Sequence, residues 1–151
     1  MDIHGLVPLL QVFDMPTSIH FYRDVLGFTV TGTSQPGDDC NWCSLKLNGA
    51  EIMLNTAYEA DQRPYAPDAA RIASHGDTGL FFGCEDLDAA YQHLHAQGVK
   101  LDKPKVAPYG MKQLSFTDPD GYGLCFQWPA TQENYDRWVK AYDIQPKTSA
   151  H

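Results

Sequence analysis

The stretch LLQVFDM (Leu9–Met15) returns 72 residues later as FFGCEDL (Phe81–Leu87), and Asp14 falls on Asp86. The stretch NGAEIMLN (Asn48–Asn55) returns at the same offset as DGYGLCFQ (Asp120–Gln127). Two matches with one offset indicate an internal repeat, which fixes the architecture more firmly than local propensity does. A repeat that occurs only twice predicts two similar halves that face each other.

Length and charge set the bounds of the interpretation. A chain of 151 residues with 43% hydrophobic residues is typical of one compact globular unit. The net charge of −8 argues against a nucleic-acid partner and against an anionic membrane surface. We see neither a membrane-spanning apolar run nor a signal peptide, and four cysteines do not predict a disulfide scaffold. We therefore expect no membrane partner and a cytoplasmic location.

The first half predicts one helix among four strands. Asp14 suits the N-cap of this helix and Gly27 its end. Asn48-Gly49 is a strong signal for a two-residue hairpin turn. The strands are expected at residues 6–12, 28–33, 42–47 and 51–55, and the first of them, apolar except for one residue, is expected to be buried on both faces.

The second half repeats this order after a connection at residues 57–77. A helix is expected at residues 87–97, with strands at 79–84, 112–117 and 122–128 and a short strand that begins at 99–101. Turn chemistry alone accounts for Asp118-Pro119-Asp120-Gly121 between the last two strands. A final helix is expected at residues 131–142, followed by a polar, frayed tail after Ile144.

Four short motifs carry a family resemblance: Val12–Met15, Ser18–Tyr22, Leu26–Phe28 and Phe116–Tyr122. With them the chain resembles the glyoxalase / bleomycin-resistance / extradiol-dioxygenase superfamily, also called vicinal oxygen chelate proteins, over roughly residues 5–128. The resemblance implies a single α+β domain over residues 1–151, with two β-α-β-β-β modules and a C-terminal helix. The modules, at about 5–56 and 78–128, would form a curved, half-open mixed sheet around a cleft, often in a homodimer.

The resemblance also implies four inward positions that hold a divalent metal in many relatives. Counting from the motifs places them at Val7, Met53, Gly79 and Cys125. Valine and glycine side chains cannot bind an ion, methionine binds hard ions poorly, and one cysteine is not enough. We therefore expect no metal and no other cofactor, and we regard metal-dependent isomerase, lyase or dioxygenase activity as doubtful.

The alternation of side chains along a strand extends the inward face beyond these four positions. It brings Leu9 and Gln11 into the cleft with Val7, and Asn55 with Met53. In the second half it adds Phe81 and Gln127 beside Cys125. Trp42 and Tyr109 are further candidates whose orientation the sequence leaves open. Such a lining is apolar and aromatic with neutral amides, and it predicts a planar or apolar ligand with neutral polar groups.

Two functions remain in competition. The first is a metal-free protein of the bleomycin-resistance type that binds a small, partly aromatic or apolar molecule. The alternative is a superfamily enzyme with a displaced metal site or with metal-free acid–base chemistry, which needs a general base in the cleft. Other groups are interpreted as structural: His4 and His75, and the isolated Cys40-Asn41-Trp42-Cys43 motif.

Overall fold

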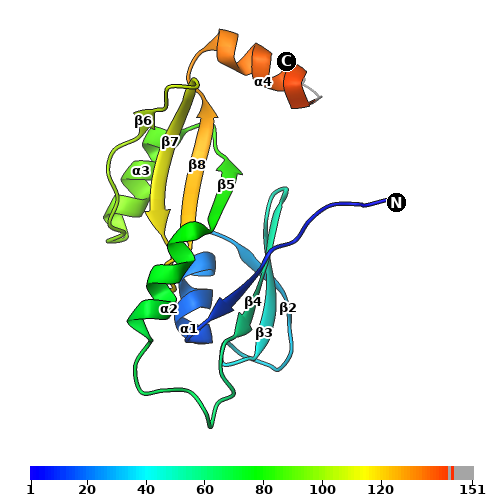
Figure 1. Cartoon of the computed structure of the whole chain (residues 1–151), viewed down its shortest axis with the longest axis vertical. Helices are drawn as coiled ribbons and strands as arrows, with labels where there is room; N and C mark the ends of the chain where they lie inside the picture. Colours follow the sequence, from blue (N-terminus) through cyan, green and yellow to red (C-terminus); the bar gives the residue numbers. More distant parts are fainter. Residues whose placement is uncertain (143, 145–151) are drawn as a thin grey trace. The chain divides into compact units, whose positions relative to one another are not determined.

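The computed structural model describes residues 1–142 and 144, so the tail predicted after Ile144 lies outside the described residues (Figure 1). The order strand, helix, strand, strand, strand occurs twice and is followed by a helix, which confirms the predicted modules. The chain divides into two compact units. The first comprises residues 1–79 and 117–123, and the second comprises residues 80–116 and the chain from Leu124 on.

The first sheet contains β1 (Leu9–Val12), β2 (Thr29–Thr33), β3 (Trp42–Leu47) and β4 (Ala50–Thr56) in the order β1-β4-β3-β2. It is mixed, because β1 runs parallel to β4 whereas β3 runs antiparallel to its neighbours. Asn48 has a φ of 52°, which confirms the tight turn between β3 and β4.

The first helix covers one face of this sheet. Asp14 caps α1 (Met15–Ile19) by accepting the Thr17 backbone N–H at 3.0 Å, as predicted. The chain continues as a π-helix, η1 (His20–Val25), in which the N–H of Leu26 bonds to the carbonyl of Phe21 at 3.0 Å. The core on this side is formed by Leu10, Val12, Ile19, Tyr22, Ile52 and Leu54, all buried.

The second sheet contains β5 (Gly79–Gly83), β6 (Lys105–Val106), β7 (Met111–Thr117) and β8 (Gly123–Pro129) in the order β5-β8-β7-β6. Gly123 N–H bonds to the Thr78 carbonyl and Cys84 N–H to the Gln127 carbonyl, both at 3.0 Å. Residue numbers rise together along the two strands, so β5 is parallel to β8, as β1 is to β4.

Helix α3 (Leu87–Ala96) lies along one face of the second sheet (Figure 1). On this sheet the ring of Phe126 packs edge to face on Phe82 and Phe116, with centroids 5.8 Å and 5.0 Å apart. After β8, helix α4 (Gln132–Tyr142) contacts the strand through Trp138, whose ring lies 5.5 Å from that of Trp128. The connection between the modules forms α2 (Ala69–Ser74) and a short 3-10 turn, η2 (His75–Asp77).

Two predicted strands differ from the structure. The first strand begins at Leu9 rather than at residue 6, and its residues alternate between exposed and buried instead of being buried on both faces. The strand predicted at 99–101 is wrong, because the edge strand β6 forms only at Lys105–Val106. Pro104 has no N–H to donate to β7, so pairing starts after it.

Candidate functional site

The register of the first sheet gathers five of the predicted contact residues on one face. The parallel pair places Leu9 beside Met53 and Gln11 beside Asn55. Across the antiparallel pair, Trp42 lies opposite Asn55 and Ser44 opposite Met53. We call this set the first open face: it lies opposite the buried, helix-covered side and consists of Leu9, Gln11, Trp42, Ser44, Met53 and Asn55.

Neutral amides provide the polar groups of the first open face. Asn55 Nδ2 donates to Gln11 Oε1 at 3.3 Å and to the Thr56 carbonyl at 3.2 Å. The two amides therefore hold each other in place, and the Gln11 side chain keeps its own NH₂ group for a further acceptor. Leu9 beside them is 47% exposed, an apolar surface next to fixed hydrogen-bonding groups.

The second sheet has a corresponding face opposite α3. Phe82 and Phe116 both contact Phe126, and Phe116 is buried as expected for the side covered by α3, so the residues that alternate with these three point the other way. We call this set the second open face: Phe81, Gln113, Ser115, Cys125 and Gln127. Phe81 is 59% exposed there.

Gln113 organises the polar groups of the second open face. Its Nε2 donates to the Tyr109 hydroxyl at 2.6 Å and to Gln127 Oε1 at 3.1 Å. These bonds fix the orientation of Tyr109, which the sequence leaves open. Sequence reasoning missed Gln113 and Ser115, although their alternation with the buried Leu114 and Phe116 is a signal that would have found them.

Cys125 differs from the other predicted contact residues because it is buried. Its thiol donates to the Phe126 carbonyl at 3.7 Å, and burial raises its pKa. The thiol is therefore protonated at neutral pH and offers a ligand little surface.

The turn between β7 and β8 is a buried polar cluster of the first unit, and the turn chemistry expected for it is not its whole role. Asp118 and Asp120 are only 5% and 2% exposed. Tyr22 donates its hydroxyl to Asp118 Oδ2 at 2.8 Å. Asp120 Oδ1 accepts the Phe13 N–H and Arg71 Nη1, each at 2.8 Å.

The same cluster holds the backbone of β1. The carbonyl of Gln11 accepts Arg71 Nη2 at 2.6 Å and the Tyr122 hydroxyl at 3.1 Å. His75 Nδ1 donates to the Asp120 carbonyl at 2.7 Å, and its ring stacks on that of Tyr122 with centroids 4.0 Å apart. The strand that carries Gln11 is thus anchored on its carbonyl side while the Gln11 side chain lies on the first open face.

The pKa shifts in this cluster follow from burial. Burial raises the pKa of the Asp118 carboxyl, although hydrogen bonds from Tyr22 and the Tyr122 N–H oppose the shift. Burial and then the nearby Asp118 charge raise the pKa of Tyr22 well above its usual value. Neither group is accessible to a ligand, so the cluster supports structure rather than proton transfer.

The histidine and cysteine groups interpreted as structural lie apart from the open faces. His4 pairs with Asp2 at 3.0 Å near the exposed N-terminus, whereas His75 contacts Asp120 and Tyr122. Cys40 and Cys43 are both buried free thiols. Burial raises the pKa of Cys43 to about 12, which disfavours the reactive thiolate.

The match to a family model settles the family of the chain. The model for the Glyoxalase/Bleomycin resistance protein/Dioxygenase superfamily matches residues 4–126. The chain belongs to this superfamily. It is also 34% identical over 114 residues to the uncharacterized protein YaeR of Escherichia coli (strain K12), an alignment that covers 74% of this chain and 84% of YaeR.

Solved structures share this fold. TnmS3, an antibiotic binding protein from Streptomyces sp. CB03234, is 27% identical with a TM-score of 0.62, and the match covers 85% of this chain and 98% of TnmS3. A glyoxalase/bleomycin resistance protein from the same Streptomyces strain is also 27% identical with a TM-score of 0.56, covering 81% of this chain and 97% of that protein.

The four positions implied for a superfamily metal do not fit a divalent ion here. In the first unit Val7 precedes β1 and offers only methyl groups, and Met53 lies on the first open face. Gly79, also in the first unit, has no side chain, and Cys125 in the second unit is a buried thiol. Among residues 1–142 and 144, no three His, Cys, Asp or Glu side chains gather in an arrangement that holds a metal ion. The residues at these four positions are therefore poor ligands for a divalent metal ion.

The helices also bear on membrane insertion. Within the described part of the chain, none of the helices has the length and apolar character needed to cross a bilayer.

Proposed function

We propose that this superfamily member binds a small, partly aromatic or apolar molecule without a metal ion. The contact residues that we propose on the first open face are Leu9, Gln11, Trp42, Met53 and Asn55. Those that we propose in the second unit are Phe81, Tyr109, Cys125 and Gln127. Bound molecules of this kind are recognised by apolar contact and by a few fixed hydrogen-bonding groups.

The observation that carries this proposal is the pairing of Gln11 with Asn55. Two neutral amides, bonded at 3.3 Å, lie on an exposed face beside apolar Leu9 and Met53. Amides offer both donors and acceptors but no charge, so they suit a ligand with neutral polar groups. The anchoring of the Gln11 carbonyl by Arg71 and Tyr122 limits the movement of this strand, which lowers the ordering cost of binding.

Similarity to TnmS3 supports binding over catalysis. That protein is an antibiotic binding protein and shares 27% identity over 85% of this chain. Binding alone can sequester a molecule, and it needs no catalytic group. The enzyme alternative needs an accessible general base, but Glu51, the carboxylate nearest to the first open face in β4, forms an ion pair with Lys46 at 3.2 Å.

Gln11→Ala tests the binding role of the first open face. We first screen aromatic metabolites and antibiotics by thermal shift, since a ligand that binds only the folded state raises the melting temperature. For a compound found in this way, Gln11→Ala should weaken the affinity about fivefold, the effect of losing one hydrogen bond. The free energy of unfolding should change by less than about 0.5 kcal/mol, since the side chain is exposed.

The matched control is Gln92→Ala, which removes the same side chain from an exposed position on α3. It should leave the affinity unchanged. Equal affinities for the wild type and Gln11→Ala would contradict the proposed contact.

Elemental analysis of protein purified without a chelator tests the metal-free part of the proposal. We expect well under one equivalent of metal per chain. One equivalent of Zn, Ni, Mn or Fe would overturn this part of the proposal and would favour the enzyme alternative.

We also propose that the chain forms a homodimer. The support is a row of exposed apolar side chains in the segment before β1, namely Ile3, Leu6 and Val7. Exposed apolar groups that lie together are typical of protein interfaces. The cytoplasmic location stays a prediction.

A further inference from the structure

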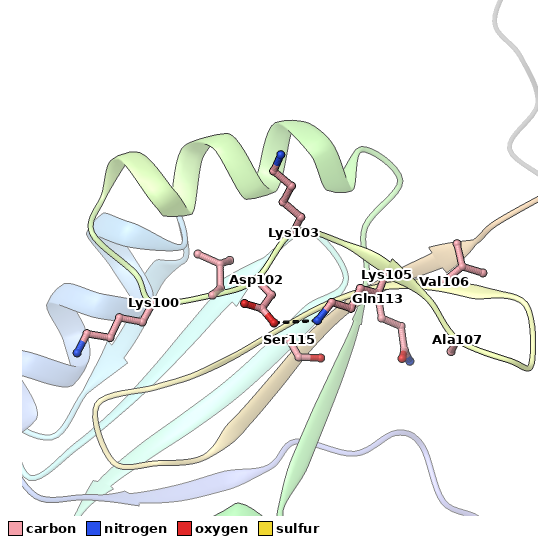
Figure 2. Close-up of a pocket in the computed structure, with 9 residues that line it drawn as sticks. Lys100, Asp102, Lys103, Lys105, Val106, Ala107, Gln113 and Ser115 are labelled. Carbon is pink, nitrogen blue, oxygen red and sulfur yellow. Dashed lines mark hydrogen bonds and ion pairs between the residues drawn. The ribbon is translucent and has the colours of Figure 1, made fainter.

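A hollow of about 600 Å³ lies in the second unit, at the β6 edge of the second sheet. Its walls come from residues 100–103 and 105–107, and its floor contains Gln113 and Ser115 (Figure 2). Both floor residues belong to the second open face, so the hollow is continuous with the proposed contact residues of this unit. Its volume lies within the range of about 300–1,000 Å³ that small-molecule sites occupy.

The charge of this hollow is opposite to that of the chain. Residues 100–112 contain four lysines and one aspartate, whereas the whole chain carries a net charge of −8. Lys100, Lys103 and Lys105 all line the hollow, with Asp102 as the only acid among the lining residues. We call this group the lysine hollow. Positive charge gathered on one concave surface attracts anions even when the whole protein repels them.

The lysines are available to a ligand. Lys105 Nζ lies 2.8 Å from Asp102 Oδ2, but both side chains are largely exposed and such a pair contributes little (Figure 2). Within the described residues, Lys100 and Lys103 form no ion pair. In Figure 2 the side chains of Lys100 and Lys103 point in directions different from that of the Lys105 side chain. Their four-carbon stems let the ammonium groups turn toward an anion.

The floor of the lysine hollow provides hydrogen bonds beside this charge. The Ser115 side chain is exposed, and its hydroxyl is both a donor and an acceptor. Gln113 already bonds to Tyr109 and Gln127, so it links the hollow to the aromatic and amide groups of the second open face. A molecule that spans both regions needs an anionic end and a planar or apolar body.

We propose that the ligand of the second open face carries an anionic oxygen group, a carboxylate or a phosphate, which binds in the lysine hollow. The inference rests on the proposed small-molecule function and narrows its ligand class. It also extends the sequence-based prediction, which considered only neutral polar groups.

A pair of probes of equal shape tests the charge requirement. Benzoate and benzamide are titrated separately into uniformly ¹⁵N-labelled protein at low salt, and inorganic phosphate is titrated in a third arm. We expect benzoate to shift the amide resonances of residues 100–103 and 105–107, Gln113 and Ser115, while benzamide leaves them in place. A shift with phosphate alone would assign the hollow to phosphate groups, and a shift with benzoate alone would assign it to carboxylates.

Variants distinguish anion binding in the lysine hollow from attraction by the electrostatic field of the whole protein. Lys100→Gln combined with Lys103→Gln should raise the dissociation constant for the bound probe about fivefold, as expected for two exposed charge contacts. Lys140→Gln, which removes one charge from α4 outside the hollow, should have little effect. Added salt should weaken binding, because it screens exposed charges.

Three outcomes would overturn the inference: no shift with either benzoate or phosphate, equal shifts with benzoate and benzamide, or equal weakening by Lys140→Gln. The proposed function has its own test through Gln11, which lies in the first unit. A compound that depends on Gln11 while no anion binds in the lysine hollow would preserve the proposed function and remove only this inference.

Discussion

At the scale of single residues, Asp120 makes the most consequential contacts of the buried turn. Its carboxylate accepts the Phe13 N–H and the Arg71 guanidinium and lies 3.3 Å from the Ser18 hydroxyl. The Arg71 and Asp120 side chains are 17% and 3% exposed, so little solvent can replace either partner. Removing one member of such a pair leaves the other charge buried without compensation.

Asp120→Ala should therefore lower the free energy of unfolding by about 3–5 kcal/mol, measured by urea denaturation. Asp120→Asn should cost less, since its amide oxygen still accepts the Phe13 N–H. Asp102→Ala is the control, because it breaks an exposed ion pair with Lys105 and should have little effect on stability. Similar losses for Asp120→Ala and Asp102→Ala would show that burial does not matter here.

The Cys43 thiol makes the stability of the folded state depend on pH in the alkaline range. Burial raises its pKa to about 12, from a usual value near 9. Between these values the unfolded chain loses the proton while the folded chain keeps it. The folded state then binds more protons, so stability is fully present below about pH 9 and falls as the pH rises.

Urea denaturation at pH 8 and at pH 10.5 should show this loss in the wild type. Cys43→Ala should be less stable at pH 8, because a buried side chain is truncated. Its further loss at pH 10.5 should be smaller than that of the wild type. Equal losses in the two proteins would rule out Cys43 as a source of the pH dependence.

The sequence predicts well which face of a sheet a side chain lies on, because side chains alternate along a strand. The parity that groups Leu9, Gln11, Met53 and Asn55 is confirmed by the register of β1 and β4. The buried roles of Asp118, Asp120 and Arg71 could not be predicted in this way. Each of them depends on contacts between segments far apart in the chain, and locally the two aspartates show only turn chemistry while Arg71 lies in a connection.

At the scale of elements, the turn that contains Gly121 packs closely against α2. Gly121 has a φ of 84°, and a Cβ built there would lie 2.5 Å from the Ile72 carbonyl oxygen. Gly98 after α3 has a similar φ of 79° but nothing within 4 Å of the added atom. An alanine at either position would have a strained backbone, but only an alanine at position 121 would also clash with a neighbouring atom.

Gly98→Ala should cost about 1–2 kcal/mol, the penalty of the left-handed conformation. Gly121→Ala should cost at least about 1 kcal/mol more, because α2 must also shift. Chemical denaturation of both variants measures the difference. Equal costs would mean that the turn and α2 move apart without penalty.

Element boundaries show where sequence patterns are reliable. The Asn48-Gly49 turn and the Asp14 cap are local signals, and both are confirmed. The strand predicted to begin at 99–101 is wrong because an alternation as short as Val99, Lys100 and Leu101 says nothing about a pairing partner. Whether an edge strand forms depends on the neighbouring β7, and Pro104 delays that pairing to Lys105.

At the scale of the whole molecule, the predicted homodimer has a direct test. Sedimentation velocity should give a dimer at micromolar concentration. Leu6→Asp, in the exposed segment before β1, should shift the protein to monomer, because a charge disfavours an apolar interface. Tyr65→Asp, at an exposed position in the connection, should leave the dimer intact. A wild-type protein that is monomeric at every concentration would contradict the proposed assembly.

The fold class could be predicted from the internal repeat with its offset of 72 residues, since a duplication constrains every element at once. The division into compact units could not, because residues 117–123 belong to the first unit although they lie in the second repeat. This assignment of the turn to the first unit arises from its polar contacts with Tyr22, Arg71 and His75. The sequence repeat carries no information about these contacts.

The place of residues 117–123 in the first unit also constrains the order of events during synthesis on the ribosome. A nascent chain that ends at Gly79 contains Tyr22, Arg71 and His75 but not yet Asp118 and Asp120, which accept their hydrogen bonds. Its first sheet can form only with these polar groups left in water or unpaired, and its final packing must wait for about 40 further residues, roughly 2–8 s of elongation. An early stop codon in the second repeat would therefore damage the half of the protein that had already been made.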